Sequence, residues 1–305
     1  MFERGLALFL YAESPVHWGT GSSLSSVDLP VQRERHTDYP IAQAAGLKGS
    51  LRDFYERHGS TGAHALVESL FGSLKDGETA GCVAVSDARL LLFPVRSLKG
   101  TFAYVTSRFA LARLERDLDR LEIPPDWKVP DEPAEGKALV VTGSKNVLEG
   151  QKLILEEFFF EARESQELDK IAGWIAEHAF PAPEDSFWQA HLAKGMVLLP
   201  GDAFRDFVRH ATTVETHIRI DDDTGTAAEH MLFTQEVVPA DSLFWSLVLC
   251  AKPFQSKNGS PLKSATQVMT ELSSRLDNDR MQTGGDATTG RGQVALRTQA
   301  GAQEN

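Results

Sequence analysis

The sequence predicts an α+β fold, and three observations lead to this class. A mostly apolar strand at residues 5–14 is followed by a helical stretch, and an alternating hairpin spans about 212–238. An apolar strand, a helix and a glycine-rich loop then precede a last strand. This order of elements suits ferredoxin-like repeats, and no repeat of the solenoid type is present.

Length and charge limit the class of protein further. The chain has 305 residues, 42% of them hydrophobic, and a formal net charge of -12. This acidity argues against a protein that coats nucleic acid with a basic exterior, but it is compatible with a local basic groove. Cys82 and Cys250 lie in apolar runs without metal-ligand spacing, so we expect buried reduced thiols. The N-terminal stretch is too short for a signal peptide or membrane span, and we expect a cytoplasmic protein.

The first half of the chain alternates strand and helix patterns. After the strand at 5–14 comes a long polar loop, which is typical of functional connections. Two glycines inside the first predicted helix, Gly46 and Gly49, suggest that something packs closely against its backbone. In order, the predicted elements are a helix after Pro40 with Gly59 as its stop, a helix at 60–72 capped by Ser60 or Thr61, two strands at 81–95 about a Ser-Asp turn, a strand at 101–107 and an amphipathic helix at 107–122 that includes Phe109 and Ala112 on its apolar side.

The second half begins with a proline-rich acidic excursion at about 123–137, which we place outside the core. Strands follow at 137–144 and 152–165, then a helix at 167–180. TTVETHIRI and EHMLFTQEVV alternate strictly on either side of DDDTG, which predicts an extended hairpin. The last elements are a strand buried on both faces at 242–251, a helix at 261–276, and a glycine-rich loop with a strand at 284–299.

Motifs of several other protein classes are missing. WGTGSSLSS follows a strand, but Leu24 stands where a dinucleotide fingerprint needs a third glycine. The chain has no P-loop, no GxSxG elbow and no zinc-ligand spacing. Asp221, Asp222 and Asp223 fit a hairpin turn better than a metal site. The histidines His17, His36, His210 and His217 suit surface or nucleic-acid contacts better than metal ligation.

Residues 14–52 carry the densest polar chemistry. Asp28 lies in a polar loop just before Arg33 and Arg35. Its carboxylate can bind a divalent ion or a ribose hydroxyl, or it can pair with one of these arginines at the surface. The residues alone favour neither the ligand-binding interpretation nor the ion pair. Lys48 and Arg52 are one helical turn apart beside the two glycines, which suits either a phosphate chain or a solvated basic face.

Four segments, taken together, resemble a known family. They are HWGTGSSLSSVDLPVQRERHTDYP, LKGSLR, GGDATTGRG and VETHIRIDDDTGTAAEHMLFTQEVVPADSLF. As a set they closely resemble the backbone subunits of the Cmr complex, the type III-B CRISPR effector, in the RAMP superfamily. The resemblance covers nearly the whole chain, and its most specific parts are VDLPVQRERHT and LKGSLR.

The resemblance implies a fold and partners. It implies one RRM-related RAMP palm over residues 1–297, with a thumb hairpin at about 212–238, additional helices and a flexible tail at 298–305. Copies would stack head to tail along a crRNA, with target RNA and other Cmr subunits as partners and no membrane. The aromatic stacking motif of RRM proteins is absent, so the resemblance does not extend to base stacking on the sheet.

The resemblance also implies roles for individual residues. Asp28 would be needed for target cleavage with a divalent ion, Mg2+ or Mn2+, and His17 is a candidate helper. The thumb would displace one target nucleotide per subunit, so that the 2′-hydroxyl attacks its own phosphate and gives a cyclic phosphate. The implied RNA-binding residues are Gly19, Gly21, Arg33, Arg35, Lys48, Gly49, Arg52, His217, Gly284, Gly285, Gly290, Arg291 and Gly292.

Two other functions stay open. A non-catalytic RNA-binding scaffold of the same superfamily would keep the RNA contacts but leave cutting to another subunit. A metabolic nucleotide-binding enzyme, suggested by GTGSS, would bind a small molecule without RNA.

Overall fold

The computed structural model describes residues 2–58, 63–73, 80–181, 186–220, 227–254 and 260–301. Its strands are β1 (Arg4–Ala12), β2 (Ile41–Ala42), β3 (Val83–Val85), β4 (Ala88–Arg96), β5 (Phe102–Ser107), β6 (Lys137–Val140), β7 (Val147–Leu148), β8 (Lys152–Leu155), β9 (Phe158–Glu164), β10 (Met196–Leu199), β11 (Thr213–Ile220), β12 (Ala227–Val237), β13 (Leu243–Cys250), β14 (Arg280–Gln282) and β15 (Gln293–Ala300). Its α-helices are α1 (Ala44–His58), α2 (Ala63–Phe71), α3 (Arg108–Arg120), α4 (Gln166–His178), α5 (Ser186–Gly195), α6 (Gly201–His210) and α7 (Ala265–Leu276).

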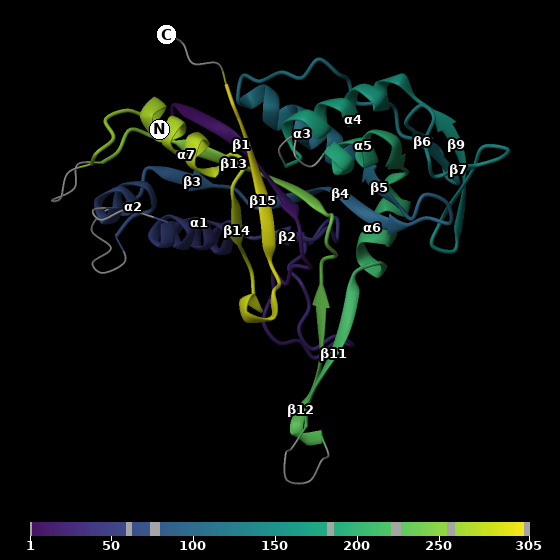
Figure 1. Cartoon of the computed structure of the whole chain (residues 1–305), viewed down its shortest axis with the longest axis horizontal. Helices are drawn as coiled ribbons and strands as arrows, with labels where there is room; N and C mark the ends of the chain where they lie inside the picture. The colour runs from purple at the N-terminus through teal and green to yellow at the C-terminus, as the bar shows by residue number, and fades with distance from the viewer. Residues whose placement is uncertain are drawn as a thin grey trace.

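One large sheet forms the body of the molecule (Figure 1). Its order is β14-β15-β1-β13-β4-β5-β10-β6-β9-β8-β7, with β2 beside β4 and β3 beside β13. The neighbours β15, β1, β13 and β4 are all antiparallel, with α1 following β1 and α7 lying between β13 and β15 in the chain. The α+β class is therefore confirmed. No helix in these residues is long and apolar enough to cross a bilayer.

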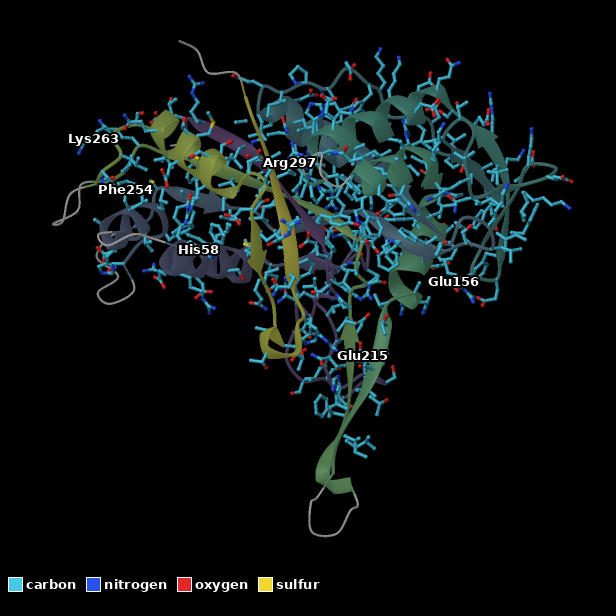
Figure 2. The ribbon with its side chains drawn as sticks, viewed as in Figure 1. His58, Glu156, Glu215, Phe254, Lys263 and Arg297 are labelled. Carbon is cyan, nitrogen blue, oxygen red and sulfur yellow. The ribbon has the colours of Figure 1, made fainter. Side chains whose placement is uncertain are left out.

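The predicted hairpin is present as β11 and β12. The two strands pair from Thr213 with Val237 to Ile218 with Leu232, and the register shifts before Ile220. The hairpin projects away from the body, and Figure 2 shows Glu215 on it.

Some predictions fall on residues that the structure does not describe. They concern the helix stop at Gly59, the caps at Ser60 or Thr61, the turn at Asp221, Asp222 and Asp223, and the tail from residue 302.

Strand β1 explains why helices cover both faces of the sheet. Successive side chains of a strand point to opposite faces. Leu8 packs in a core that includes residues of α1 and α7, whereas Phe9 packs in a second core with residues of α3 and α4. The predicted apolar strand at 242–251 is likewise confirmed as β13, which is buried along almost its whole length. Cys82 and Cys250 are free, buried thiols, as predicted.

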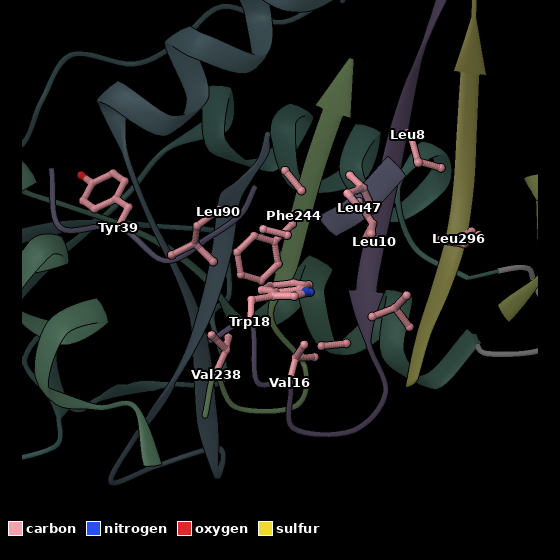
Figure 3. Close-up of a cluster of buried hydrophobic side chains, with 14 of the residues drawn as sticks. Leu8, Leu10, Val16, Trp18, Tyr39, Leu47, Leu90, Val238, Phe244 and Leu296 are labelled. Carbon is pink, nitrogen blue, oxygen red and sulfur yellow. The ribbon is translucent and has the colours of Figure 1, made fainter. Parts of the chain in front are cut away.

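The polar loop after β1 is anchored in the first of these cores (Figure 3). Trp18 is 5% exposed, and its ring meets Phe244 edge-on with centroids 4.8 Å apart. Val16 is fully buried and exchanges two backbone hydrogen bonds of 2.9 Å with Val238, just beyond β12. The loop is therefore fixed to the base of the hairpin by burial of its own apolar residues.

The start of the first helix differs from the prediction. Ile41 and Ala42 pair with β4 instead, and both are buried. The helix begins at Ala44, whose N–H donates to the Asp87 carboxylate at 2.8 Å. Burial of a β-branched residue in the sheet outweighs the helical periodicity here.

The predicted Ser-Asp turn between the strands at 81–95 does not reverse the chain. Both β3 and β4 pair antiparallel with β13, so they are two parts of one interrupted strand. The Ser86 N–H donates to the Leu247 carbonyl at 2.9 Å and keeps the break beside β13.

The excursion at 123–137 is mostly exposed or half-buried, as predicted, but one of its residues, Trp127, lies in the core. Trp127 is 2% exposed and packs in the second core, with its ring 5.9 Å from that of Trp174. One large apolar side chain therefore outweighs the polar composition around it. On α3, Phe109 and Ala112 are exposed, contrary to the predicted apolar side.

The end of the chain and one internal segment also differ from the sequence prediction. Strand β15 runs to Ala300 and pairs with Leu6 of β1, so residues 298–300 belong to the sheet and not to a tail. The elements α5, β10 and α6 lie between the predicted helix at 167–180 and the hairpin, in a stretch for which no element is predicted above.

Candidate nucleic-acid interface

Three of the segments singled out in the sequence meet at one buried hydroxyl. Thr283, at the start of the glycine-rich turn 283–292, is 1% exposed. Its Oγ1 lies 3.1 Å from the Ser50 hydroxyl of α1, which donates to it, and 3.1 Å from the Trp18 indole nitrogen, a second donor. The Gly285 N–H also donates to the His17 carbonyl at 2.9 Å. The polar loop, the LKGSLR helix and the glycine-rich turn thus form one surface.

This surface lies at the base of the hairpin, where the loop after β1 and the β14–β15 turn flank β11 and β12 (Figure 1). Leu29 exchanges backbone hydrogen bonds of 3.0 Å with β12, donating to the Thr234 carbonyl and accepting from the Glu236 N–H. The segment around Leu29 therefore covers the outer edge of β12, opposite its pairing with β11.

Asp28 is exposed and is held by one residue of β12. Its Oδ2 accepts from the Thr234 N–H at 2.7 Å and from the Thr234 hydroxyl at 2.9 Å. The Asp28 N–H donates to the same hydroxyl at 3.0 Å. The Thr234 backbone N–H, followed by its hydroxyl, lowers the pKa of Asp28 below its ordinary value. Asp28 is therefore an oriented carboxylate that stays ionised at neutral pH.

Neither predicted arginine partner holds Asp28. Arg33 donates from Nη2 to Glu236 Oε1 at 2.5 Å, and from Nη1 to the carbonyls of Asp38 and Val208. Its side chain is 19% exposed. Arg33 is thus part of the internal support of the loop, and its role as an RNA contact stays a prediction.

Two further predicted RNA contacts also point inward. Arg52 is 12% exposed and donates to the Gly72 carbonyl just after α2 at 2.7 Å and to Glu56 at 2.8 Å. Arg291 is 11% exposed and pairs with Glu215 of β11. Arg52 and Arg291 therefore join elements of the chain, and their guanidinium groups are largely unavailable to phosphate.

The other predicted cations differ from these and from each other. Lys48 is half-buried and donates to the Val83 carbonyl at 2.9 Å, and burial lowers the pKa of its ammonium group. Arg35 is exposed, and within the described ranges no hydrogen bond or ion pair is recorded for its side chain. Arg35 is thus the predicted arginine best placed to meet an RNA phosphate.

The glycines singled out in the sequence fall into three groups. At Gly284 and Gly292 φ is +80° and +73°, and a Cβ would lie 2.6 Å from the His17 carbonyl oxygen and 1.9 Å from that of Thr283. These two glycines are required by the turn itself. An added Cβ has no neighbour within 4 Å at Gly46 and Gly49 on α1, at Gly21 in the polar loop and at Gly290. At Gly19 it would lie 2.5 Å from Nε2 of His17, and at Gly285 it would lie 3.5 Å from Cδ2 of the same ring. The expected close packing on α1 is absent within the described chain, which leaves that backbone open to a partner.

His17, the candidate catalytic helper, and His217, a predicted RNA contact, both have partners other than Asp28. His17 is 9% exposed, and its Nδ1 lies 2.7 Å from the Glu236 carbonyl oxygen. His217 stacks on Phe233 of β12 with centroids 5.1 Å apart, and its Nε2 lies 3.8 Å from Glu215, beyond hydrogen-bond reach. His17 supports the base of the interface, and His217 lies on the hairpin. His36 and His210 are exposed, as predicted.

A divalent ion would find one carboxylate at this edge. Among the described residues no three His, Cys, Asp or Glu side chains gather to hold a metal. Mg2+ commonly binds through one or two carboxylates and keeps water and substrate phosphate as its other ligands. The Asp28 carboxylate fits an ion of that kind, which takes most of its ligands from outside the protein, and not an ion caged by the protein.

Two functional residues were not singled out in the sequence, Thr234 and Glu236. They are two positions apart in FTQEV and so share one face of β12. Glu236 is 6% exposed, and its carboxylate accepts from Arg33, from the Thr212 hydroxyl at 2.7 Å and from the Val31 N–H at 3.0 Å. The available signal was a pair of polar residues on one face of a predicted strand near its base.

Comparison with known proteins agrees with this architecture. The family model of the RAMP superfamily matches residues 9–295, so the chain belongs to this superfamily. It is 35% identical over 299 residues to the CRISPR system Cmr endoribonuclease Cmr4 of Pyrococcus furiosus, covering 94% of this chain and 93% of that protein. Within the superfamily the chain therefore belongs to the Cmr4 family.

Solved structures support the same fold. The oligomeric Cmr4 crystal structure from Pyrococcus furiosus aligns with a TM-score of 0.74 at 27% identity, covering 99% of this chain and all of that one. A chain of the type III-B Cmr-beta complex bound to cognate target RNA aligns with a TM-score of 0.71 at 21% identity, over 97% of this chain and 98% of that one. At that identity the second likeness concerns the fold alone.

Proposed function

We propose that the chain is a crRNA-binding backbone subunit of a type III-B CRISPR effector complex. We propose further that it cuts complementary target RNA, with Asp28 as the catalytic residue. The observation that carries this proposal is the exposed Asp28 carboxylate, held by Thr234 at the base of a projecting hairpin. The names of its relatives, a Cmr endoribonuclease and an oligomeric Cmr4, agree with cutting and with stacking of copies. Its partners would be crRNA, target RNA, further copies of itself and other Cmr subunits.

The four central strands also suit the ferredoxin-like palm expected for such a subunit. Their order β15-β1-β13-β4, with α1 after β1 and α7 before β15, corresponds to a split βαβ arrangement. In this arrangement the glycine-rich turn joins β14 to β15 and faces the base of the hairpin. We assign the open backbone of α1, the glycine-rich turn and Arg35 to the crRNA, and the edge that carries Asp28 to the target strand.

The proposed reaction is an internal transesterification. The 2′-oxygen of the target attacks the adjacent phosphorus and loses its proton, and the bond from phosphorus to the 5′-oxygen breaks as that oxygen gains a proton. The products are a 2′,3′-cyclic phosphate and a 5′-hydroxyl. Because its pKa is lowered, Asp28 is a weak base, so it acts by orienting the hydroxyl or by holding positive charge. A divalent ion, when bound beside Asp28 and an RNA phosphate, would supply charge neutralisation.

The test is cleavage by the assembled complex with Asp28→Ala. We expect unchanged assembly and target binding, and loss of the evenly spaced products that carry a cyclic phosphate end. Asp131→Ala, which removes a fully exposed carboxylate of the excursion at 123–137, is the matched control. Undiminished cutting by the Asp28 variant would favour a scaffold without catalytic activity. Cutting that persists in a chelator would separately remove the divalent ion from the proposal.

A further inference from the structure

A large groove lies outside the nucleic-acid interface. It has a volume of about 1130 Å³ and is formed by α6, by the β8–β9 turn and the start of β9, and by the segment around residues 132–136. It reaches Thr212, where the hairpin begins. Figure 2 shows Glu156, one of its residues, at the edge of the body above the hairpin. We refer to it as the acidic groove.

The acidic groove is strongly negative. Its walls carry six carboxylates and neither lysine nor arginine, the six being Glu132, Glu135, Glu156, Glu157, Asp202 and Asp206. Only two cations of the described chain, both outside the walls, are recorded beside these carboxylates: Arg96 pairs with Glu156 and Glu157, and Arg205 pairs with Asp202 and Asp206. Arg96 and Arg205 are 67% and 44% exposed, so they neutralise the groove weakly.

The same groove also exposes aromatic surface. Phe158 and Phe159 follow the β8–β9 turn and are 58% and 55% exposed. Phe158 meets the buried Phe207 of α6 edge-on, with centroids 5.6 Å apart, so its ring is positioned. Two adjacent phenylalanines beside clustered carboxylates form a surface that guanidinium and ammonium groups recognise through both charge and ring faces.

We propose that the acidic groove binds a lysine- and arginine-rich segment, with at least one apolar side chain, from a different protein subunit of the effector complex. RNA is excluded as the occupant because its phosphates would face six carboxylates. A second copy of this chain is a poor source of dense positive charge. The chain has a net charge of -12, and nowhere in its 305 residues do two lysines or arginines stand next to each other.

This inference rests on the proposed function only in seeking the partner within the assembled complex. The experiment places the photoreactive residue p-benzoylphenylalanine at Phe159, cross-links the purified complex, and identifies the products by mass spectrometry. The matched control places it at Phe254, which is 45% exposed and lies at the opposite end of the body from Glu156 (Figure 2). We expect position 159 alone to cross-link to a basic segment of a different subunit.

Charge reversal tests the chemistry of the contact. The double variant Glu135→Lys and Asp206→Lys should abolish this cross-link and lower retention of that subunit at least tenfold, whereas Glu177→Lys on the exposed part of α4 should change neither. A circular dichroism spectrum like that of the original chain establishes that the double variant is folded. Cross-links to RNA or to another copy of this chain, no cross-link at 159, or retention unaffected by charge reversal would each overturn the proposal. The cut made at Asp28 is measured separately, so either idea can fail alone.

Discussion

Replacing Glu236 by Gln should destabilise the loop that carries Asp28. The Glu236 carboxylate accepts from Arg33 and Thr212 on Oε1 and from the Val31 N–H on Oε2. Gln has one acceptor oxygen and one NH2 group. Whichever way the amide turns, the NH2 faces a donor, either the Val31 N–H or the Arg33 and Thr212 donors.

The size of the effect follows from burial and charge. A hydrogen bond to a charged group contributes about 1.5–3 kcal/mol. Breaking a fully buried ion pair costs about 3–5 kcal/mol. Because Glu236 is 6% exposed and the Arg33 side chain is 19% exposed, the lower end applies. We expect Glu236→Gln to lower the free energy of unfolding by about 3 kcal/mol, which corresponds to a fall in Tm of roughly 5 °C for a chain of this length.

Urea and thermal unfolding of the isolated subunit, followed by circular dichroism, measure this change. Glu161→Gln is the control, since that carboxylate is 59% exposed and lies 3.5 Å from Lys137, and it should shift the free energy by less than about 0.5 kcal/mol. A loss below about 1 kcal/mol for Glu236→Gln would refute the view that this carboxylate supports the loop.

Two further predictions separate residues that orient chemistry from those that bind RNA or support the fold. Thr234→Val removes the hydroxyl that holds Asp28, so the pKa of Asp28 should rise toward its ordinary value and the acid limb of the pH profile of cleavage should move to higher pH. The rate of cutting should fall about tenfold. Thr234→Ser keeps the hydroxyl and should preserve the pKa, the pH profile and the rate, as NMR titration and cleavage assays will check. Arg35→Ala should reduce the slope of log K against log salt concentration for RNA binding by about one. Arg52→Ala should leave that slope unchanged and lower the free energy of unfolding by about 1–2 kcal/mol. Equal slopes for both variants would contradict the assignment.

The fold was predictable where local pattern and burial coincide. The apolar run of β1 predicts a buried strand, and the alternation of β11 and β12 predicts a pair of strands. Both elements are present. Trp127 shows the limit of this reasoning. Proline and acid surround it, so composition predicts an exposed segment, but the tryptophan finds Trp174, 47 positions away, and is buried.

The candidate site was predictable as a region but not as a set of contacts. The loop, the LKGSLR helix and the glycine-rich turn do meet, at Thr283. An arginine faces inward when an acceptor remote in the sequence lies beside it. Arg33 forms an ion pair with Glu236, and Arg291 forms one with Glu215. Sequence spacing cannot give such pairings, so Arg33 could be predicted as a cation but not as an internal one.

The hairpin base couples the two RNA-facing parts of the proposed interface. Thr234 and Glu236 hold the Asp28 loop, while Gln235, between them on the opposite face of β12, donates to Asp286 of the glycine-rich turn at 2.6 Å. Glu215 of β11 pairs with Arg291 of the same turn. A movement of the hairpin would therefore displace the carboxylate and the turn together. Under the proposed function, these contacts of the hairpin base would set the distance between the surface that holds the guide and the cutting position, and so would keep cuts in register with the stacking of subunits.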